Sequence, residues 1–158
     1  MTLASRALEP DAAVLRGLEH SLPMQLLKAR EAAMTRFRPM LRGHGLTEQQ
    51  WRVIRVLAAY PDIDASDLAR RSLLLAPSLT RILQRLEATK LIKRKADVSD
   101  QRRAVFVLTA RGERLFADVA PDSERLYAAI AVEFGAARLQ TLYDLLAEFS
   151  ATLDVKAG

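Results

Sequence analysis

The sequence predicts a mainly α-helical fold that carries one small β-hairpin. Two observations support this fold class. Apolar residues recur at helical spacing behind N-cap residues, and two short runs of strand-forming residues flank a polar loop. The composition is that of an ordinary globular protein, because half of the 158 residues are hydrophobic and 27% are charged. A chain of this length is expected to form one domain around a single core.

Two helices are predicted in the first part of the chain. Ser21 is a favourable N-cap, and we expect a long helix from there to Gly43. Its apolar residues cover more than one narrow stripe, which predicts burial on more than one side. Thr47 and Gln50 have the spacing of a capping box, so a second helix begins there and ends before Pro61.

The next two helices are shorter. Asp64 begins the third, because carboxylates in a first turn suit the helix dipole, and Pro77 begins the fourth. The fourth helix has an apolar face with the spacing i, i+3, i+4, i+7, formed by Leu79, Ile82, Leu83 and Leu86. Its opposite face carries hydrogen-bond donors, which are Ser78, Thr80, Arg81, Gln84 and Arg85.

The hairpin and two more helices complete the prediction. Residues 91–95 and 104–108 are expected to be strands on either side of the polar loop DVSDQRR. Thr109 caps a helix that runs to about residue 134, and a last helix covers about 136–153. Apolar residues form a seam along that last helix, namely Leu139, Leu142, Leu146, Phe149 and Leu153.

Composition excludes several classes of protein. Without cysteine there is no disulfide framework, thiolate nucleophile or Cys-ligated metal, and two histidines are too few for most metal sites. The sequence has no nucleophile elbow, phosphate loop or dinucleotide fingerprint. No apolar run approaches the length of a membrane span, and the first residues lack the apolar region of a secretory signal. We therefore expect a cytoplasmic protein that is not an enzyme and has no metal or cofactor.

Positive charge is concentrated in one segment. Residues 70–103 hold ten basic and three acidic side chains, whereas the segments before and after are close to neutral or negative. Such side chains could simply solvate a surface. Their concentration between two near-neutral arms favours contact with nucleic acid.

Three short helices followed by a basic hairpin are typical of a winged helix-turn-helix that binds double-stranded DNA. The donor face of the fourth helix suits the major groove, and arginines at the hairpin tip suit the narrow minor groove. Lysines along the hairpin can contact phosphates. The candidate DNA-binding residues are Ser78, Thr80, Arg81, Gln84, Arg85, Lys93, Lys95, Arg102 and Arg103.

The hairpin sequence resembles a family signature. Residues 97–102, followed by 104–109 and Gly112, resemble the D-x-x-D-x-R…L-T-x-x-G pattern of the MarR family of multiple-antibiotic-resistance-type repressors. The resemblance covers nearly the whole chain. Within the family, residues 26–58 and 77–80 are similar to the members that repress homoprotocatechuate degradative operons. Gln101 departs from the pattern, since many members have a second arginine there.

The resemblance implies a homodimer that binds a pseudo-palindromic operator. It divides the single domain 1–158 into an arm at 1–20, dimerisation helices at 21–45 and 110–155, and a DNA-binding lobe at 47–108. The residues agree, because long terminal helices with surplus apolar side chains are better buried against a second copy. A monomer whose first helix packs on its own last two helices is the alternative. The expected dimer-interface residues are Leu139, Leu142, Leu146 and Phe149.

The resemblance further implies a small aromatic carboxylic acid, such as a hydroxyphenylacetate, as effector. A carboxylate needs a cation and the ring needs an apolar wall. The candidates, with Arg38 and Arg30 preferred for the carboxylate, are Arg30, Met34, Phe37, Arg38, His44, Trp51 and Arg55. These candidates also have plainer interpretations, because Trp51 could be a core residue, His44 a loop residue and the arginines members of surface ion pairs. A DNA-binding protein with another effector or none, and a dimeric interaction module without DNA binding, are the alternative functions.

Overall fold

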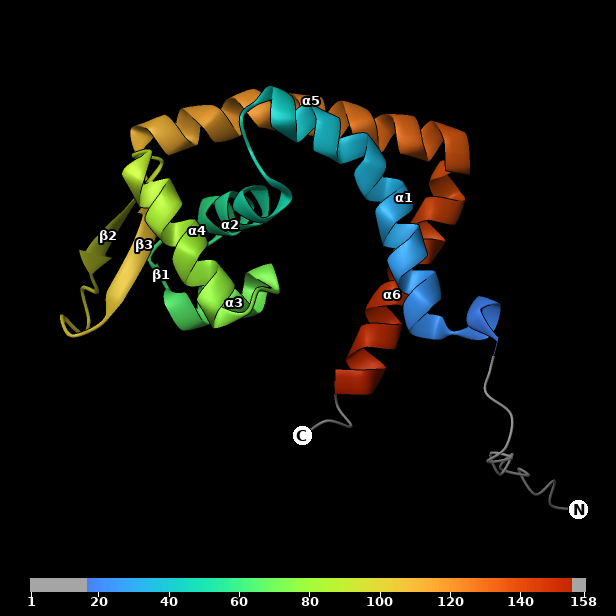
Figure 1. The fold of residues 1–158 in the computed structure, drawn as a ribbon, viewed down its shortest axis with the longest axis horizontal. Helices are drawn as coiled ribbons and strands as arrows, with labels where there is room; N and C mark the ends of the chain where they lie inside the picture. The colour runs from blue at the N-terminus through green and yellow to red at the C-terminus, as the bar shows by residue number, and fades with distance from the viewer. Residues whose placement is uncertain (1–16, 155–158) are drawn as a thin grey trace, which may run out of the picture. The chain divides into compact units, whose positions relative to one another are not determined.

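The computed structural model describes residues 17–154, so most of the expected N-terminal arm and residue 155 lie outside the described part. The chain divides into two compact units, one ending at Thr35 and one beginning at Arg36, and each is described here by itself. Along the chain the elements are η1 (Leu18–His20), α1 (Leu22–Gly43), α2 (Glu48–Ala59), β1 (Ile63–Asp64), α3 (Ala65–Ser72), α4 (Ala76–Ala88), β2 (Ile92–Ala96), β3 (Ala104–Leu108), α5 (Ala110–Phe134) and α6 (Ala136–Asp154) (Figure 1).

The described part of the first unit contains η1 and most of α1. The Gln25 side chain donates a hydrogen bond to the carbonyl of Glu19, 2.9 Å away, and so links the two elements. The carbonyl of Ser21 accepts the first hydrogen bond of α1, which agrees with the predicted N-cap position. Leu22 and Leu27 are about half exposed, although the sequence predicts burial on more than one side of this helix.

Three helices of the second unit have the N-caps that the sequence predicts, and α4 begins at Ala76, one residue before the predicted Pro77. The Thr47 hydroxyl accepts a hydrogen bond from the Gln50 amide, and the Gln50 side chain accepts one from the Thr47 amide, so the capping box is confirmed. Asp64 caps α3 through the Asp67 amide. Thr109 caps α5 in the same way.

The sheet has one strand more than the sequence predicts. It is antiparallel with the order β1-β3-β2, and β1 pairs Ile63 with Phe106 and Asp64 with Val105. The hairpin itself is confirmed, with Ile92 opposite Leu108 and Ala96 opposite Ala104. The strand β1 has only two residues, which is too short for a periodic pattern.

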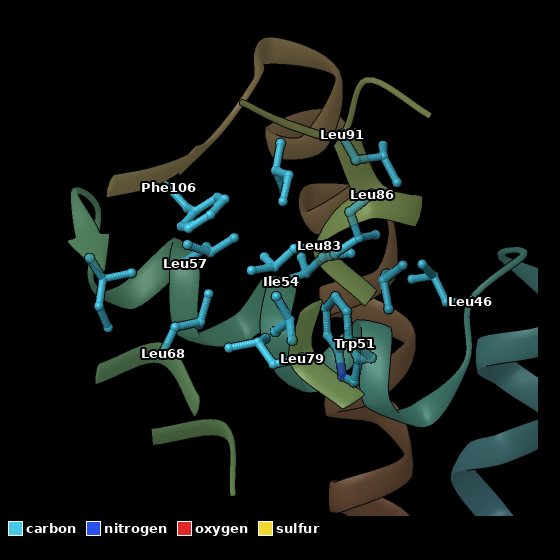
Figure 2. Close-up of a cluster of buried hydrophobic side chains, with 14 of the residues drawn as sticks. Leu46, Trp51, Ile54, Leu57, Leu68, Leu79, Leu83, Leu86, Leu91 and Phe106 are labelled. Carbon is cyan, nitrogen blue, oxygen red and sulfur yellow. The ribbon is translucent and has the colours of Figure 1, made fainter. Parts of the chain in front are cut away.

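The core of the second unit lies between α2, α3, α4 and the sheet (Figure 2). The predicted inner face of α4 is confirmed, because Leu79, Leu83 and Leu86 are buried and Ile82 packs partly buried against them. Each such leucine contributes roughly 1.5–3 kcal/mol of burial free energy. Leu41 of α1 and Val119 of α5 join the same core and anchor both long helices to the lobe.

The last two helices meet at Gly135, whose φ of 97° lies in a region that favours glycine. In Figure 1 α5 extends away from the hairpin of β2 and β3, and α6 turns back from the far end of α5. No residue of α6 is buried in the single chain. In the described part of the chain, no helix has the length and apolar character needed to cross a membrane.

Candidate DNA interface and effector site

The outer face of α4 presents its donors to solvent. Ser78, Thr80, Arg81, Gln84 and Arg85 are all exposed, as the sequence predicts. The Thr80 hydroxyl donates to the carbonyl of Ala76 at 3.0 Å, and a hydroxyl oxygen that donates can still accept a hydrogen bond. Among the described residues, neither Arg81 nor Arg85 has an ion-pair partner. Both guanidinium groups are therefore available to a polyanion.

Two aspartates of the hairpin shape its tip. Asp97 accepts hydrogen bonds from the amide and hydroxyl of Ser99, both at 3.0 Å, and Asp100 accepts one from the Arg102 amide at 3.0 Å. The Asp97 amide donates to the carbonyl of Arg103, which closes the loop. The acidic residues of the signature thus fold the turn, and the Arg102 side chain is left exposed at the tip.

Other cations of the hairpin are tied to the lobe. Arg103 forms an ion pair with Asp64, the residue that caps α3, and Lys95 lies 2.6 Å from Asp62. The side chain of Lys95 is still 43% exposed and that of Arg103 is 55% exposed. Lys93 is exposed on β2, and in the described part of the chain it has no ion-pair partner.

A groove of about 450 Å³ separates the helix face from the hairpin. It brings together four predicted residues from distant parts of the chain, which are Thr80, Gln84, Arg102 and Arg103. The other five predicted DNA-binding residues do not line this groove, namely Ser78, Arg81, Arg85, Lys93 and Lys95. The hairpin lines this groove with cations, and α4 lines it with hydrogen-bond donors. Such a groove suits one strand of the DNA backbone, whose phosphates could be contacted from both sides.

Two of the predicted effector residues of the second unit, Phe37 and Arg55, contact Tyr127 and form an aromatic cluster with it. The rings of Phe37 and Tyr127 lie 4.8 Å apart, and Arg55 Nη1 lies 3.5 Å from the Tyr127 hydroxyl. Trp51, one turn before Arg55 on α2, is buried and stacks on Phe116 at 5.6 Å. Tyr127 is a residue that the sequence did not single out, because nothing local marks its proximity to Arg55, 72 positions away.

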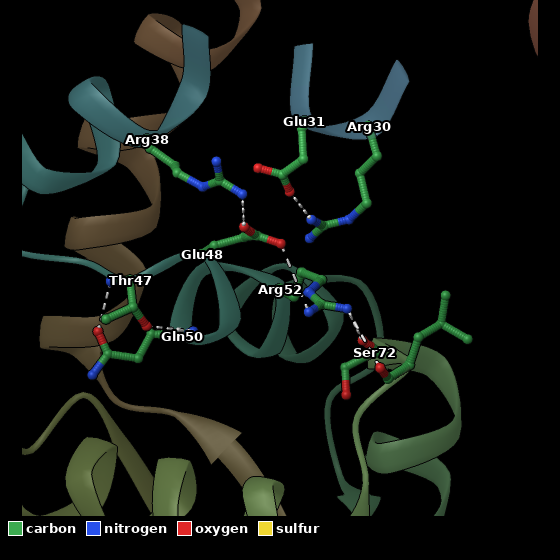
Figure 3. A network of polar contacts seen from close by, with 9 residues as sticks. Arg30, Glu31, Arg38, Thr47, Glu48, Gln50, Arg52 and Ser72 are labelled. Atoms are coloured by element: carbon green, nitrogen blue, oxygen red, sulfur yellow. Dashed lines mark hydrogen bonds and ion pairs between the residues drawn. The ribbon is translucent and has the colours of Figure 1, made fainter. Parts of the chain in front are cut away.

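Three of the remaining effector candidates have a carboxylate partner within the protein. Arg38 pairs with Glu48 at 3.4 Å, and Arg30 pairs with its neighbour Glu31 at 3.0 Å (Figure 3). His44 donates from Nε2 to Asp122, 2.7 Å away. Arg30 and Met34 belong to the first unit.

Three charged groups near the α1–α5 contact have shifted pKa values. The hydrogen bond from His44 lowers the pKa of Asp122 below its ordinary value, and Arg125 adds to this effect. Arg36 of α1 binds both oxygens of Glu133 of α5, at 2.6 and 2.7 Å. That hydrogen bonding lowers the pKa of Glu133 and raises the pKa of Arg36. One pair joins α5 to the residue that follows α1, and the other joins α5 to α1 itself.

The expected dimer residues lie along α6, and none of them is fully buried in the described part of the chain. Leu142 and Leu146 are exposed, and Leu139 and Phe149 are only partly buried.

Among the described residues, no group of His, Asp or Glu side chains could hold a metal ion.

The helical lobe, the exposed donor face of α4 and the basic hairpin define a winged helix-turn-helix transcriptional regulator that binds DNA. The MarR family model matches residues 44–103. The homoprotocatechuate degradative operon repressor of Escherichia coli is 45% identical over 134 residues, which cover 85% of this chain and 90% of that protein. The chain belongs to the MarR family, whose members are transcriptional regulators and not enzymes.

Two further similarities extend over most of the chain. The HTH-type transcriptional regulator FarR of Neisseria gonorrhoeae is 43% identical over 82% of this chain and 89% of its own length. The crystal structure of NadR in complex with 4-hydroxyphenylacetate is 41% identical and has a TM-score of 0.78, with 85% of this chain and 98% of NadR covered.

Proposed function

We propose that the protein is a homodimeric repressor of aromatic-acid degradation genes, released from its operator by a phenolic acid of the hydroxyphenylacetate type. The similarity to a homoprotocatechuate operon repressor over most of both chains is the observation that carries this proposal. NadR, similar over nearly its whole length, binds 4-hydroxyphenylacetate. A regulator of this kind acts on the chromosome, which places it in the cytoplasm.

The DNA contacts are divided between helix and hairpin. Arg81, Gln84 and Arg85 lie on the exposed face of α4 and reach base edges in the major groove. Ser78 and Thr80, near the start of the helix, contact phosphate. Arg102 enters the minor groove, and Lys93 contacts the backbone. Lys95 and Arg103 keep enough exposure to contact phosphate beside their ion pairs.

The dimer forms through the terminal helices. The seam on α6 is apolar, runs the length of the helix and is only partly covered by the described residues. A second copy related by two-fold symmetry would bury the same seam on both subunits. Such a dimer places two α4 helices for the two halves of a pseudo-palindromic operator.

The effector binds at the aromatic cluster, with its carboxylate on an arginine and its ring against apolar walls. Arg55 is the strongest candidate for the carboxylate, because within the described residues it makes no ion pair and it lies beside the Tyr127 hydroxyl. Arg38 and Arg30 already face a carboxylate, which an anionic effector would have to displace. Phe37 and Trp51 supply the walls, while Met34 and His44 are candidates that the sequence alone supports.

Titration of the dimer with 4-hydroxyphenylacetate and 3,4-dihydroxyphenylacetate tests this function. The operator is first selected from random DNA, and its affinity is measured with and without each acid. We expect at least one acid to bind the free protein and to weaken operator binding, because an effector must bind the two states unequally to shift them. Benzoate serves as a control for unspecific binding of aromatic anions. Lack of binding by both acids would refute the proposed effector class.

A further inference from the structure

Glu48, the first residue of α2, lies between two arginines from different parts of the fold (Figure 3). Its Oε2 is 3.4 Å from the Arg38 guanidinium of α1, and its Oε1 is 3.8 Å from Arg52, one turn further along α2. The Glu48 side chain is only 16% exposed. Water therefore screens these interactions less than those of an ordinary surface pair.

Arg52 connects α2 to the turn that precedes α4. Its Nη1 donates to the carbonyl of Ser72 at 3.0 Å and lies 3.4 Å from the carbonyl of Leu73. The last carbonyls of a helix have no partner within that helix, and an arginine can satisfy them. The C-terminal end of α3 is therefore fixed from outside by a residue of α2.

This turn determines where α4 begins. Leu73 has φ 53° and ψ 47°, a left-handed conformation that is unfavourable for a leucine and needs support from its surroundings. The helix α4 begins at Ala76, and its N-cap Leu75 makes no side-chain capping hydrogen bond. The restraints on the turn, including those from Arg52, thus position the first residues of the DNA-binding helix.

The other end of the network adjoins the proposed effector site. Phe37, which contacts Tyr127, directly precedes Arg38 in α1. If a ligand ring packed against Phe37 displaces this part of the helix, the Arg38–Glu48 contact is displaced with it. The contacts Arg38–Glu48, Glu48–Arg52 and Arg52–Ser72 then form an unbroken polar path to the turn.

We propose that Glu48 is a positioning residue that transmits the placement of the C-terminal part of α1 to the recognition helix α4, by orienting Arg52 on the turn between α3 and α4. The link to an effector rests on the proposed function. The restraint on the turn is a property of the free protein and can be tested without an effector.

Amide hydrogen exchange of the full-length protein measures that restraint. The Leu74 amide is the probe, because it donates to the Ala69 carbonyl at 3.0 Å within the turn. We expect Glu48→Gln and Arg52→Gln to speed its exchange by about tenfold, as for loss of a charged hydrogen bond. Arg52→Lys, which keeps a cation but not the forked donor, should restore part of the protection. Asp67→Asn is the matched control, since it removes an exposed ion pair to Arg70 from α3.

DNA binding separates positioning from general stability. Both glutamine variants should lose about tenfold in affinity for the selected operator and little affinity for scrambled DNA. Contacts to base edges require α4 to be positioned accurately, whereas contacts to phosphates can form when the helix is slightly displaced. Amides of the β2–β3 ladder should exchange as in the wild type. Faster exchange throughout the lobe, with equal loss on both DNAs, would show a purely structural role and overturn the proposal. Wild-type exchange and operator affinity in Glu48→Gln would also overturn it.

A final comparison includes the effector. In Glu48→Gln, 4-hydroxyphenylacetate should bind with wild-type affinity yet weaken operator binding much less. Full release by the acid in this variant would contradict transmission through Glu48. If instead the wild type ignores the acid, the proposed effector class fails, while the exchange of Leu74 still decides whether Glu48 positions the turn.

Discussion

Gly112 of α5 lies directly against the carbonyl oxygen of Leu91, and a Cβ on this glycine would stand 2.1 Å from that oxygen. The oxygen belongs to the backbone, which also accepts a hydrogen bond from the Thr109 amide at 3.0 Å. It cannot move aside as a flexible side chain could. The glycine of the family signature is thus required by the close approach of α5 to the hairpin.

Gly112→Ala should destabilise the protein by about 1–3 kcal/mol, as expected for overpacking in a rigid site. Urea denaturation followed by circular dichroism measures this change. Gly43→Ala is the control, because a Cβ there meets nothing within 4 Å and alanine favours a helix. A Gly112→Ala variant as stable as the wild type would contradict the described contact.

Replacing Arg81 or Gln84 by alanine should alter which operator sequences are preferred, at a cost of about 1–3 kcal/mol on the selected operator. Replacing Lys93 or Arg102 should weaken binding to all sequences and reduce its salt dependence. Binding isotherms at several salt concentrations, on operator and scrambled DNA, distinguish the two classes. Unchanged affinity in all four variants would contradict the proposed interface.

Leu146→Asp should prevent dimer formation. Leu146 is 38% exposed in the single chain, so an aspartate there would be tolerated in a monomer. In a dimer it would place an unpaired charge in an apolar seam at a cost of several kcal/mol. Sedimentation velocity at micromolar concentration measures the outcome. A monomeric wild type would contradict the dimer, and Glu148→Gln on the same helix is the control.

Arg55→Gln should reduce the affinity for 4-hydroxyphenylacetate by roughly tenfold or more, because it removes a charge-assisted contact to the carboxylate. Operator binding without the acid should stay unchanged, since Arg55 lies outside the basic segment. Arg42→Gln, an exposed cation at the end of α1, is the control. Calorimetry measures ligand affinity, and unchanged binding in Arg55→Gln would move the site to Arg38 or Arg30.

Stability should decrease at acidic pH through Asp122 and Glu133. Hydrogen bonds from His44 and Arg36 lower the pKa of these carboxyls in the folded state. Their stabilising effect is therefore present above the unfolded pKa and is lost as pH falls through the folded pKa, below about pH 5. Urea midpoints between pH 7 and 3 should depend less on pH in Asp122→Asn and Glu133→Gln than in the control Glu124→Gln. Equal pH dependence in all three would contradict the assignment.

The elements that the sequence predicted correctly depend on local interactions. The caps at Thr47, Asp64 and Thr109 each bind an amide three residues away, so their spacing is visible in the sequence. The inner face of α4 follows helical periodicity for the same reason.

What the sequence did not predict depends on contacts between distant residues. Asp64 is visible as a helix cap, but its ion pair with Arg103 needs the fold. The preference for Arg38 and Arg30 rested on the family resemblance and on their place in a predicted helix, and the carboxylate partner that each has in the structure was not predicted. The contact of Arg55 with Tyr127 likewise depends on how α2 packs on α5.

The short strand β1 has a consequence for the kind of DNA this protein selects. It pairs with β3 directly before α3, and Arg103 and Lys95 bind the acids beside it. The hairpin is thereby fixed to the same frame as the recognition helix, and the two cannot adapt separately to a curved duplex. We therefore expect the duplex to deform to fit the protein, so that DNA steps that bend easily and narrow minor grooves are favoured even where no side chain contacts a base.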